Sequence, residues 1–174
     1  DYILFFTNKG KVYRVKCYEI PESSRTSKGT NVANILPIDG DERVTSMIKV
    51  SEFEKDHFLV MITKHGIIKR TPLESFNSSR RGGLIALDLD QNDELSWVRL
   101  TDGSENILVA TKKGKCIRFL ENEVRSVGRS ARGVRAIRLG SGDEVVGMVV
   151  VKDNSLIFTL SELGYGRLSI PDEY

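Results

Sequence analysis

The 174-residue sequence has few of the residues on which metal-binding and disulfide-rich proteins depend: two histidines, two cysteines and four prolines. Cys17 and Cys116 lie far apart in alternating segments, so we expect no disulfide framework and two small, buried thiols in a reducing compartment. Two cysteines are also too few for a zinc site of the usual ligand number. His57 and His65 have no partner at a spacing typical of metal ligands, which favours exposed histidines over a metal site.

Long apolar runs and phosphate-binding loops are lacking too. No stretch of about 18 apolar residues is present, so we expect no membrane-spanning helix and no membrane partner. The first residues lack the basic region and cleavage site of a signal peptide, which predicts a cytoplasmic protein. No glycine-rich loop ends in Lys-Ser or Lys-Thr, so no ATP site is predicted. With 40% hydrophobic and 29% charged residues, the composition indicates a globular protein of one domain or two small ones.

What the sequence does have is a repeat, marked by three short motifs in the same order. The first is a turn that ends in glycine after an apolar run, with the glycines 56, 48 and 50 residues apart. The second is an acidic pair, whose recurrence at turns favours a structural role over a catalytic or metal-binding one. The third is a basic loop of Ser, Arg and Gly. The turns are 8–10, 64–66, 112–114 and 162–164; the acidic pairs are Asp41-Glu42, Asp93-Glu94 and Asp143-Glu144; the basic loops are 24–29, 79–83 and 129–133.

Each repeat predicts four strands. The first is a short apolar run that suits a strand buried on both faces, and the glycine turn leads from it to the second. The basic loop leads to the third strand, and the acidic turn leads to the fourth. No segment has a helical period over about 12 residues, so we predict an all-β chain with repeats at roughly 2–53, 57–103, 106–151 and 155–174. The first strands are predicted at 3–7, 58–63, 107–111 and 156–160, the second at 11–16, 67–70 and 115–119, the third at 31–36, 84–89 and 134–139, and the fourth at 44–50, 95–100 and 145–151.

Four-stranded units of about 50 residues predict blades that stack side by side, because one small sheet cannot bury both faces without neighbours. A propeller or a variant of it fits this repeat better than a sandwich. Periodicity leaves open whether neighbouring blades exchange a strand. We expect Trp97 to pack between blades. Because the sequence stops at Tyr174, just after the second strand of a fourth unit, we expect a piece of a longer array.

The formal net charge of +2 at first argues against a nucleic-acid partner, but the charges are unevenly distributed. Residues 9–29 hold six basic and two acidic side chains, residues 64–83 hold five and one, and residues 112–138 hold nine and two. These windows contain 20 of the 26 basic residues, at the same place in every repeat. In a radial array they would form a positive band along one rim, which suits the regularly spaced phosphates of duplex DNA.

Two other interpretations of the basic residues remain open. Lys and Arg also solubilise exposed strand edges and prevent sheets from associating edge to edge. A basic rim would equally suit an acidic protein, which would make the chain a protein-interaction propeller. The recurrence of the basic loop in three repeats favours DNA or RNA, and the paired guanidiniums of Arg80 and Arg81 are suited to phosphate oxygens.

Four segments of the sequence, within and around the basic loops, resemble the C-terminal domain of the DNA gyrase A protein. The resemblance covers the whole chain and follows the repeat order of that family. It implies a β-pinwheel, which is a propeller-like disc of about six blades with strands exchanged between neighbours. It also implies that duplex DNA wraps around a basic outer rim. The segments that carry the resemblance are YEIPESSRTSKG (18–29), GLIAL (83–87), VRSVGR (124–129) and RGVR (132–135).

The defining element of that family, the gyrase box Gln-Arg-Arg-Gly-Gly-Lys-Gly, is matched only at its centre, by Arg80-Arg81-Gly82-Gly83. Ser79 stands where the box has Gln, and Leu84-Ile85 replace Lys-Gly. The resemblance therefore places this loop in a later blade and the full box upstream of Asp1. The related protein of topoisomerase IV has a similar domain with degenerate boxes and remains the close alternative.

The resemblance further implies an accessory domain without a catalytic centre, in which wrapping of double-stranded DNA, independent of base sequence, supports negative supercoiling. The nucleophilic tyrosine of the family belongs to a separate domain, so none of the five tyrosines here is assigned that role. The implied parent is a bacterial, nucleoid-associated heterotetramer of the gyrase A and B proteins, in which other parts use ATP and Mg²⁺. No cofactor and no small-molecule substrate is expected in this chain. The residues predicted to contact DNA are Arg14, Lys16, Arg25, Lys28, Lys69, Arg70, Arg80, Arg81, Arg118, Arg129, Arg132 and Arg135.

Overall fold

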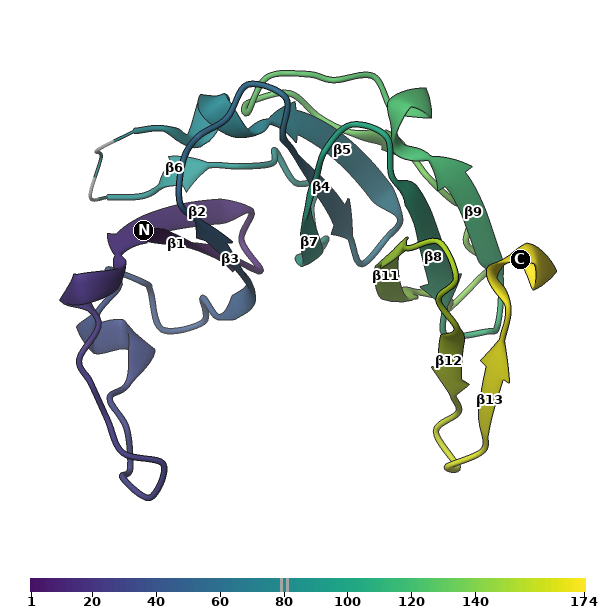
Figure 1. Ribbon diagram of the computed structural model, residues 1–174, viewed down its shortest axis with the longest axis horizontal. Helices are drawn as coiled ribbons and strands as arrows, with labels where there is room; N and C mark the ends of the chain where they lie inside the picture. Colours follow the sequence, from purple (N-terminus) through teal and green to yellow (C-terminus); the bar gives the residue numbers. More distant parts are fainter. Residues whose placement is uncertain (79, 81) are drawn as a thin grey trace.

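The computed structural model describes residues 1–78, 80 and 82–174. These residues form small antiparallel sheets that follow one another along an arc, from the N-terminal sheet at one end to a C-terminal hairpin at the other (Figure 1). None of the described helices is long and apolar enough to cross a membrane. The strands are β1 (Tyr2–Thr7), β2 (Lys11–Lys16), β3 (Val44–Val50), β4 (Phe58–Thr63), β5 (Ile67–Pro72), β6 (Leu84–Ile85), β7 (Leu95–Thr101), β8 (Asn106–Thr111), β9 (Cys116–Leu120), β10 (Val134–Arg135), β11 (Val145–Val151), β12 (Ile157–Leu160) and β13 (Gly166–Ser169). The 3₁₀ helices are η1 (Cys17–Glu19), η2 (Val32–Asn34), η3 (Leu73–Phe76), η4 (Glu121–Glu123) and η5 (Pro171–Glu173).

The glycine turns of the repeat close the first hairpin of each sheet. Gly10 and Gly66 have φ angles of 71° and 83°, in the left-handed region that glycine enters at little cost. Gly10 donates its N–H to Thr7 O at 3.0 Å, and Gly66 donates to Thr63 O at 3.1 Å. Because these turns join β1 to β2, β4 to β5 and β8 to β9, the predicted first and second strands are confirmed.

Each complete sheet takes its outermost strand from the next repeat. The first sheet has the order β3-β1-β2-β6 and the second has the order β10-β5-β4-β7, so β6 and β10 lie outside their own repeats. Val12 pairs with Leu84 in the first sheet, and Ile68 pairs with Val134 in the second. The third sheet has the order β11-β8-β9, and β12 pairs with β13. The fold is therefore the all-β pinwheel with exchanged strands that the resemblance implied, and the exchange answers the question that periodicity left open.

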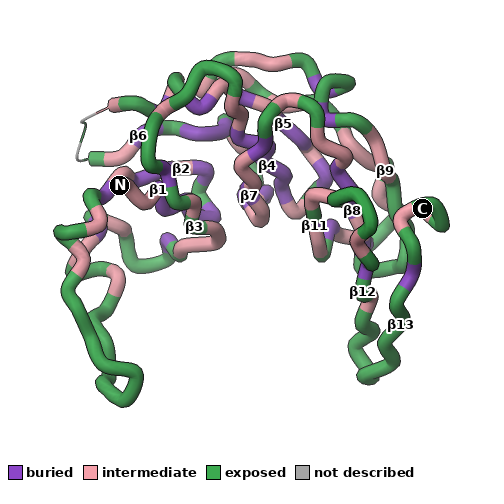
Figure 2. Tube along the Cα trace, viewed as in Figure 1, coloured by how far each residue is buried: buried purple, intermediate pink, exposed green. Residues whose placement is uncertain are grey.

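The first strands β1, β4 and β8 are largely buried, and β4 packs against a neighbouring blade on each face (Figure 2). In β12, Phe158 and Leu160 are exposed, so the expected burial on both faces is wrong for residues 156–160. On β4, Leu59 and Met61 belong to the core between the first and second sheets, whereas Val60 and Ile62 belong to the core between the second and third. Trp97 on β7 packs against the second of these cores, between blades as expected. Since successive side chains of a strand point to opposite faces, one apolar run supplies two cores.

The third strands are much shorter than predicted. Residues 84–89 contribute only the two residues of β6, and residues 134–139 contribute only the two of β10. Residues 31–36 pair with no strand among the described residues; Asn31 Oδ1 instead accepts a hydrogen bond from Ala33 N at 3.0 Å and caps η2. An extended segment becomes a strand only where a neighbouring edge supplies its hydrogen bonds. The position of these segments in the repeat therefore does not determine the length of the strand.

The expectation of two buried thiols is wrong. Cys17 is half-buried and Cys116 is exposed. Cys116 begins β9, and the outer edge of β9 pairs with no strand in the part of the chain that the structure describes. The side chain therefore lacks the covering neighbour that the equivalent residue Val12 has in the first sheet.

The strand exchange predicts that Gly133→Ala is destabilising. A methyl group at this position would lie 2.3 Å from Ile68 O, and neither backbone can move away without breaking the pairing of β10 with β5. We expect the free energy of unfolding to fall by about 1–3 kcal/mol, the usual cost of overpacking, in urea denaturation. Gly140→Ala is the control, because a methyl group there meets no atom within 4 Å. Equal stability of the two variants would contradict the close approach of the exchanged strand.

Candidate nucleic-acid interface

The acidic pairs hold the turns between sheets, as their recurrence predicted. Asp93 is buried, and its Oδ1 accepts hydrogen bonds from two backbone N–H groups at 2.8 and 3.0 Å. Asp143 repeats these contacts with the N–H groups of Lys113 (2.9 Å) and Glu144 (3.0 Å). Burial favours the neutral acid, but the hydrogen bonds outweigh it and hold the pKa of Asp143 below its usual value. The hydrogen bonds therefore keep the Asp143 carboxylate charged, and both aspartates serve the structure of the turn.

In the second and third pairs, the glutamate contacts the previous repeat, whereas Glu42 of the first pair accepts hydrogen bonds from Thr7 and Tyr13 of its own repeat. Arg43 contacts Glu94 at 2.5 Å, and Lys64 contacts Glu144 at 3.0 Å. The Lys64 ammonium lowers the pKa of Glu144. Exposed ion pairs of this kind contribute little to stability, but they neutralise charge at the acidic turns. The excess of positive charge is left in the basic windows.

Three of the predicted DNA contacts occupy one position on the second strand of successive repeats, and each contacts the repeat that follows. Arg14 and Arg70 are half-buried, and their guanidinium carbons lie 4.7 and 4.2 Å from the ring centres of Tyr2 and Phe58. Nη1 of Arg14 donates to Asn77 Oδ1 (2.9 Å), Nη1 of Arg70 donates to Glu121 O (3.0 Å) and Nη1 of Arg118 donates to Asp172 Oδ1 (3.3 Å). These acceptors lie in or directly after η3, η4 and η5, so the three arginines link consecutive blades.

Lys69 was predicted at the surface but lies in the interior, where it is 1% exposed. Its ammonium donates hydrogen bonds to the carbonyl oxygens of Gly128 (3.2 Å), Arg129 and Ala131 (3.1 Å). Burial, reinforced by the nearby guanidinium of Arg129, lowers the pKa of Lys69 to about 8. In this position Lys69 supports the third basic loop from beneath and has no open path to a phosphate.

The arginines of the third basic loop lie across the junction with the second repeat. Arg132 is exposed, and its guanidinium forms ion pairs with Asp88 (3.3 Å) and Asp90 (3.2 Å). Arg129 is half-buried and donates from Nη1 to Ile85 O on β6 at 3.3 Å. Both side chains therefore reach the outer part of the first and second sheets from a loop of the third repeat.

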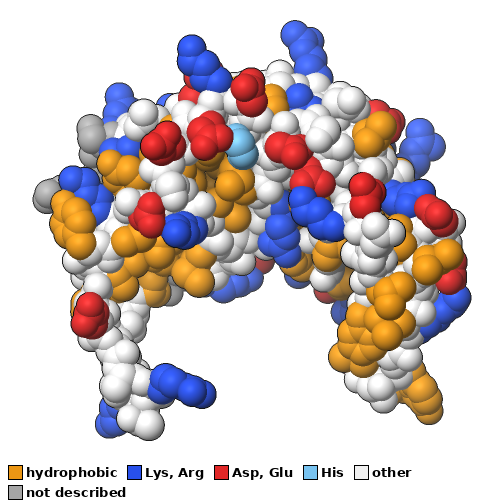
Figure 3. All heavy atoms as spheres, viewed as in Figure 1, with side chains coloured by type: hydrophobic (Ala, Val, Ile, Leu, Met, Phe, Trp, Pro, Cys, Tyr) orange, Lys and Arg blue, Asp and Glu red, His pale blue; other side chains and the backbone are white. Residues whose placement is uncertain are grey.

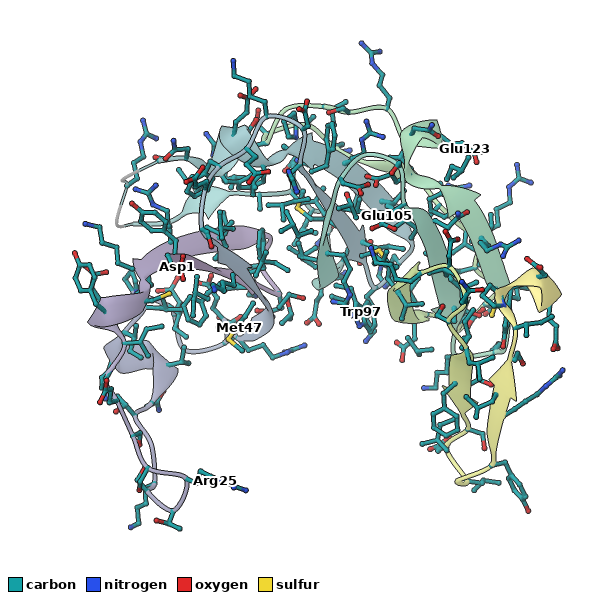
Figure 4. All side chains as sticks on the ribbon, in the orientation of Figure 1. Asp1, Arg25, Met47, Trp97, Glu105 and Glu123 are labelled. Atoms are coloured by element: carbon teal, nitrogen blue, oxygen red, sulfur yellow. The ribbon has the colours of Figure 1, made fainter. Side chains whose placement is uncertain are left out.

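The remaining predicted contacts are exposed or lie outside the described residues. Residues 21–30 form an exposed loop that projects from one end of the arc, and Arg25 lies at its tip (Figure 4). Lys16, at the end of β2, is exposed and lies 5.4 Å from the ring centre of Tyr18. Exposed side chains are also found at Lys28, Arg80 and Arg135, whereas Arg81 is not among the described residues.

Basic side chains project outward along the convex edge of the arc, while Asp and Glu side chains gather on the face just inside it (Figure 3). Two further basic residues, Lys115 and Arg138, were not among the predicted contacts, although both fall in the basic window 112–138. Together with Arg135 they line an open groove of about 650 Å³ between β9 and the segment that follows β10. Their signal in the sequence was the charge of the window rather than any motif.

Among the described residues, no group of three or more His, Cys, Asp or Glu side chains is placed to hold a metal ion. The histidines have local partners instead: His57 Nδ1 lies 2.9 Å from Glu54, and His65 Nδ1 lies 3.6 Å from Asp93. The candidate site is thus an extended charged surface. Its chemistry is the binding of anions by exposed guanidinium and ammonium groups.

Comparison with known proteins identifies the family. Residues 1–51, 57–102 and 105–152 match the family described as DNA gyrase C-terminal domain, beta-propeller. The chain belongs to this family. Each matched range overlaps one of the first three repeats.

Individual relatives show how much of a larger protein this sequence represents. The chain is 46% identical over 177 residues to the DNA gyrase A protein of Staphylococcus aureus (strain MRSA252), a match that covers 100% of this chain and 20% of that protein. Among solved structures, the C-terminal domain of DNA topoisomerase IV superposes with a TM-score of 0.91 and 30% identity, over 100% of this chain and 55% of that one. A DNA gyrase A C-terminal domain superposes with a TM-score of 0.80 and 27% identity, over 97% and 54% of the two chains. The chain spans about one fifth of the curated relative and about half of each solved domain.

The contacts of Arg70 predict a loss of stability when its side chain is removed. Arg70→Ala deletes a charge-assisted hydrogen bond to Glu121 O and the packing of the guanidinium on Phe58. Such a bond contributes about 1.5–3 kcal/mol, so we expect a decrease of that size in the free energy of unfolding, measured by urea denaturation. Arg138→Ala, at an exposed arginine, should change it by less than about 0.5 kcal/mol. A small effect of both substitutions would contradict the blade-linking role.

Proposed function

We propose that this chain binds duplex DNA through its phosphates along the convex edge, bending the duplex around the arc without reading base sequence. The observation that carries the proposal is that exposed arginines and lysines occur at the same place in successive repeats. The chain belongs to a family described as the DNA gyrase C-terminal domain. A curved row of cations, separated from the paired acids of the turns, suits a polyanion with evenly spaced charge.

The proposed contacts fall into two groups. The exposed residues are proposed as direct phosphate contacts, together with half-buried Arg129, with Arg81, and with the groove residues Lys115 and Arg138. The arginines that link blades are proposed to maintain the curvature that the duplex follows. The exposed members predicted from the sequence are Lys16, Arg25, Lys28, Arg80, Arg132 and Arg135, and the linking group contains Arg14, Arg70 and Arg118.

Electrostatics must supply the energy that bending requires. Smooth bending of a 20–30 bp site by 40–90° costs about 1–6 kcal/mol. Each phosphate that is neutralised releases counterions, and six such contacts correspond to a slope of about −5 in log K against log salt concentration. Binding of this kind is expected to depend strongly on salt and weakly on base sequence.

In the intact protein, we propose that the domain serves a bacterial type II DNA topoisomerase as an accessory, non-catalytic part. Wrapping would present a second duplex segment for strand passage, and the rest of the gyrase A protein, together with the gyrase B protein, would supply cleavage and the use of ATP and Mg²⁺. Identity of 46% to a gyrase A protein favours gyrase, in which the outcome is negative supercoiling. The TM-score of 0.91 to a topoisomerase IV domain supports that enzyme as the alternative.

A plasmid assay separates these two enzymes. The full-length protein that carries this chain is combined with its partner protein, relaxed plasmid and ATP, and the products are resolved on chloroquine gels. Negative supercoiling that is lost on deletion of residues 1–174 supports gyrase. Relaxation without supercoiling supports topoisomerase IV and contradicts the gyrase assignment.

The proposed interface predicts how far the salt dependence of DNA binding decreases when cations of the outer edge are removed. The combined variant Arg80→Ala, Arg132→Ala, Arg135→Ala removes three exposed cations from the outer part of the sheets. We expect the slope of log K against log salt to become shallower by about 2.7, because each phosphate contact contributes about 0.9. The measurement is titration of a fluorescent duplex of about 30 bp between about 50 and 200 mM salt, the range over which such contacts are resolved.

The control for this variant removes the same charge from the inner side of the arc. Arg43→Ala, Lys49→Ala, Lys152→Ala changes exposed residues beside or within the inner strands β3 and β11, and it should leave the slope close to that of the unmodified chain. Equal slopes for the two combined variants would show that net charge, not the outer edge, governs binding. No binding near about 50 mM salt, or a response that is flat with salt, would exclude the DNA interface.

A further inference from the structure

We propose that Lys69 is a positioning residue for DNA binding: its buried ammonium, supplied by the second repeat, holds the third basic loop so that Arg129 and Arg132 face the outer edge. The inference rests on the proposed function, since it assigns what presents two of the proposed phosphate contacts. It concerns a residue that does not itself touch DNA.

The contacts of Lys69 use the full donor capacity of an ammonium group. Its three N–H donors have three carbonyl acceptors, on Gly128, Arg129 and Ala131. All three acceptors belong to one short stretch of backbone, and the donor comes from β5 of the preceding repeat. Lys69 therefore fixes the path of that backbone rather than the position of a single side chain.

Few other contacts hold the backbone of this loop. Upstream, Val127 N donates to Arg70 O at 3.0 Å; within the loop, Ala131 N donates to Gly128 O at 3.1 Å. Downstream, Gly133 lies against β5, where the pairing with β10 begins. Between these two ends, Lys69 is the described group that ties the backbone to the blade beneath. The arginine side chains of the loop make their own contacts only once the backbone is in place.

The same position in the first sheet supports a basic loop by other means. Tyr13 lies three residues after its turn glycine, as Lys69 does, and its ring packs under Gly83 at the end of the second basic loop. A methyl group on Gly83 would lie only 2.6 Å from Tyr13 Cε1. In both complete blades, this residue of the second strand thus contacts and supports the basic loop of the next repeat.

Burying a lysine at this supporting position costs free energy. A buried ammonium loses its hydration, and the three carbonyls restore hydrogen bonds but not an opposite charge. An aromatic residue fills the site in the first sheet, so packing alone does not require a charge. An apolar side chain at this position would not provide the three directional hydrogen bonds of the ammonium group.

The charged groups that face Lys69 are Arg129 from the loop and Asp88 from the second repeat, and Asp88 is itself bound to Arg132. Burial first, and then Arg129, lower the pKa of Lys69 to about 8, while Asp88 opposes them. A lowered lysine pKa means that the folded protein releases this proton more easily than the unfolded chain does. The contribution of Lys69 to global stability therefore rises as the pH increases through about 8. Opening of the loop exposes Lys69 to water and returns its pKa to the usual value, so by the same linkage the loop opens less readily as the pH increases through about 8.

The test compares Lys69→Met, which keeps a long unbranched side chain and removes its charge, with Lys49→Met at an exposed lysine on β3. Without DNA, we expect trypsin to cleave after Arg129 and Arg132 at least about tenfold faster in Lys69→Met, by local opening of the loop. Cleavage elsewhere should not change. In DNA titrations, the salt slope should become shallower by about 2, because two arginine–phosphate contacts lose their position. Lys49→Met should match the unmodified chain in both measurements.

A pH series on the unmodified chain and on Lys69→Met gives a second measurement. Between about pH 7 and 9, trypsin cleavage after Arg129 and Arg132, relative to cleavage at other sites, should slow several-fold while the urea midpoint stays constant or rises, and Lys69→Met should show no such change. Equal cleavage of the loop and an equal salt slope in Lys69→Met would overturn the positioning role, as would faster cleavage at every site together with a lower urea midpoint. Failure of the unmodified chain to bind duplex DNA would instead contradict the proposed function itself.

Discussion

The structure depends on one constraint: a sheet of this array is completed only by a strand from the next repeat. The edges of β2 and β5 obtain hydrogen-bond partners from β6 and β10, and the close approach of Gly133 to Ile68 O shows how tightly the borrowed strand fits. Unpaired backbone groups in a buried edge are costly. Neighbouring blades are therefore bound by backbone pairing as well as by the apolar cores between them.

The distribution of charge follows from the same exchange. The second and third basic loops precede the borrowed strands β6 and β10, so these loops lie at the edge of the preceding sheet. The acidic turns lie where inner strands begin, and their carboxylates are occupied by backbone N–H groups and by lysine or arginine of the previous repeat. A chain with a net charge of only +2 can thus present a strongly positive edge. Segregation by repeat position, rather than total charge, defines the surface.

The sequence allowed the repeat, the turn glycines, the burial of β4 on both faces and the basic windows to be predicted, because each depends on local composition or on spacing along the chain. It did not reveal which basic side chains face inward. Arg70 and Lys69 are adjacent on β5, yet their partners Glu121 and Gly128 lie more than 50 residues away in the next repeat. The length of β6 and β10 and the exposure of Cys116 likewise depend on the edge of another blade. Such contacts are set by tertiary structure, and a charge pattern alone does not contain them.

The equivalent contacts of Arg14, Arg70 and Arg118 have a consequence for how such a domain changes in size. Because every junction is made by the same residue position reaching the same turn of the next unit, a whole repeat can be gained or lost without remaking the junctions that remain. The rotation from one repeat to the next is a property of the junction. The number of repeats thus sets the length of polymer that can follow the edge. The radius of the path of that polymer is set by the geometry of the junction, which is the same between successive repeats.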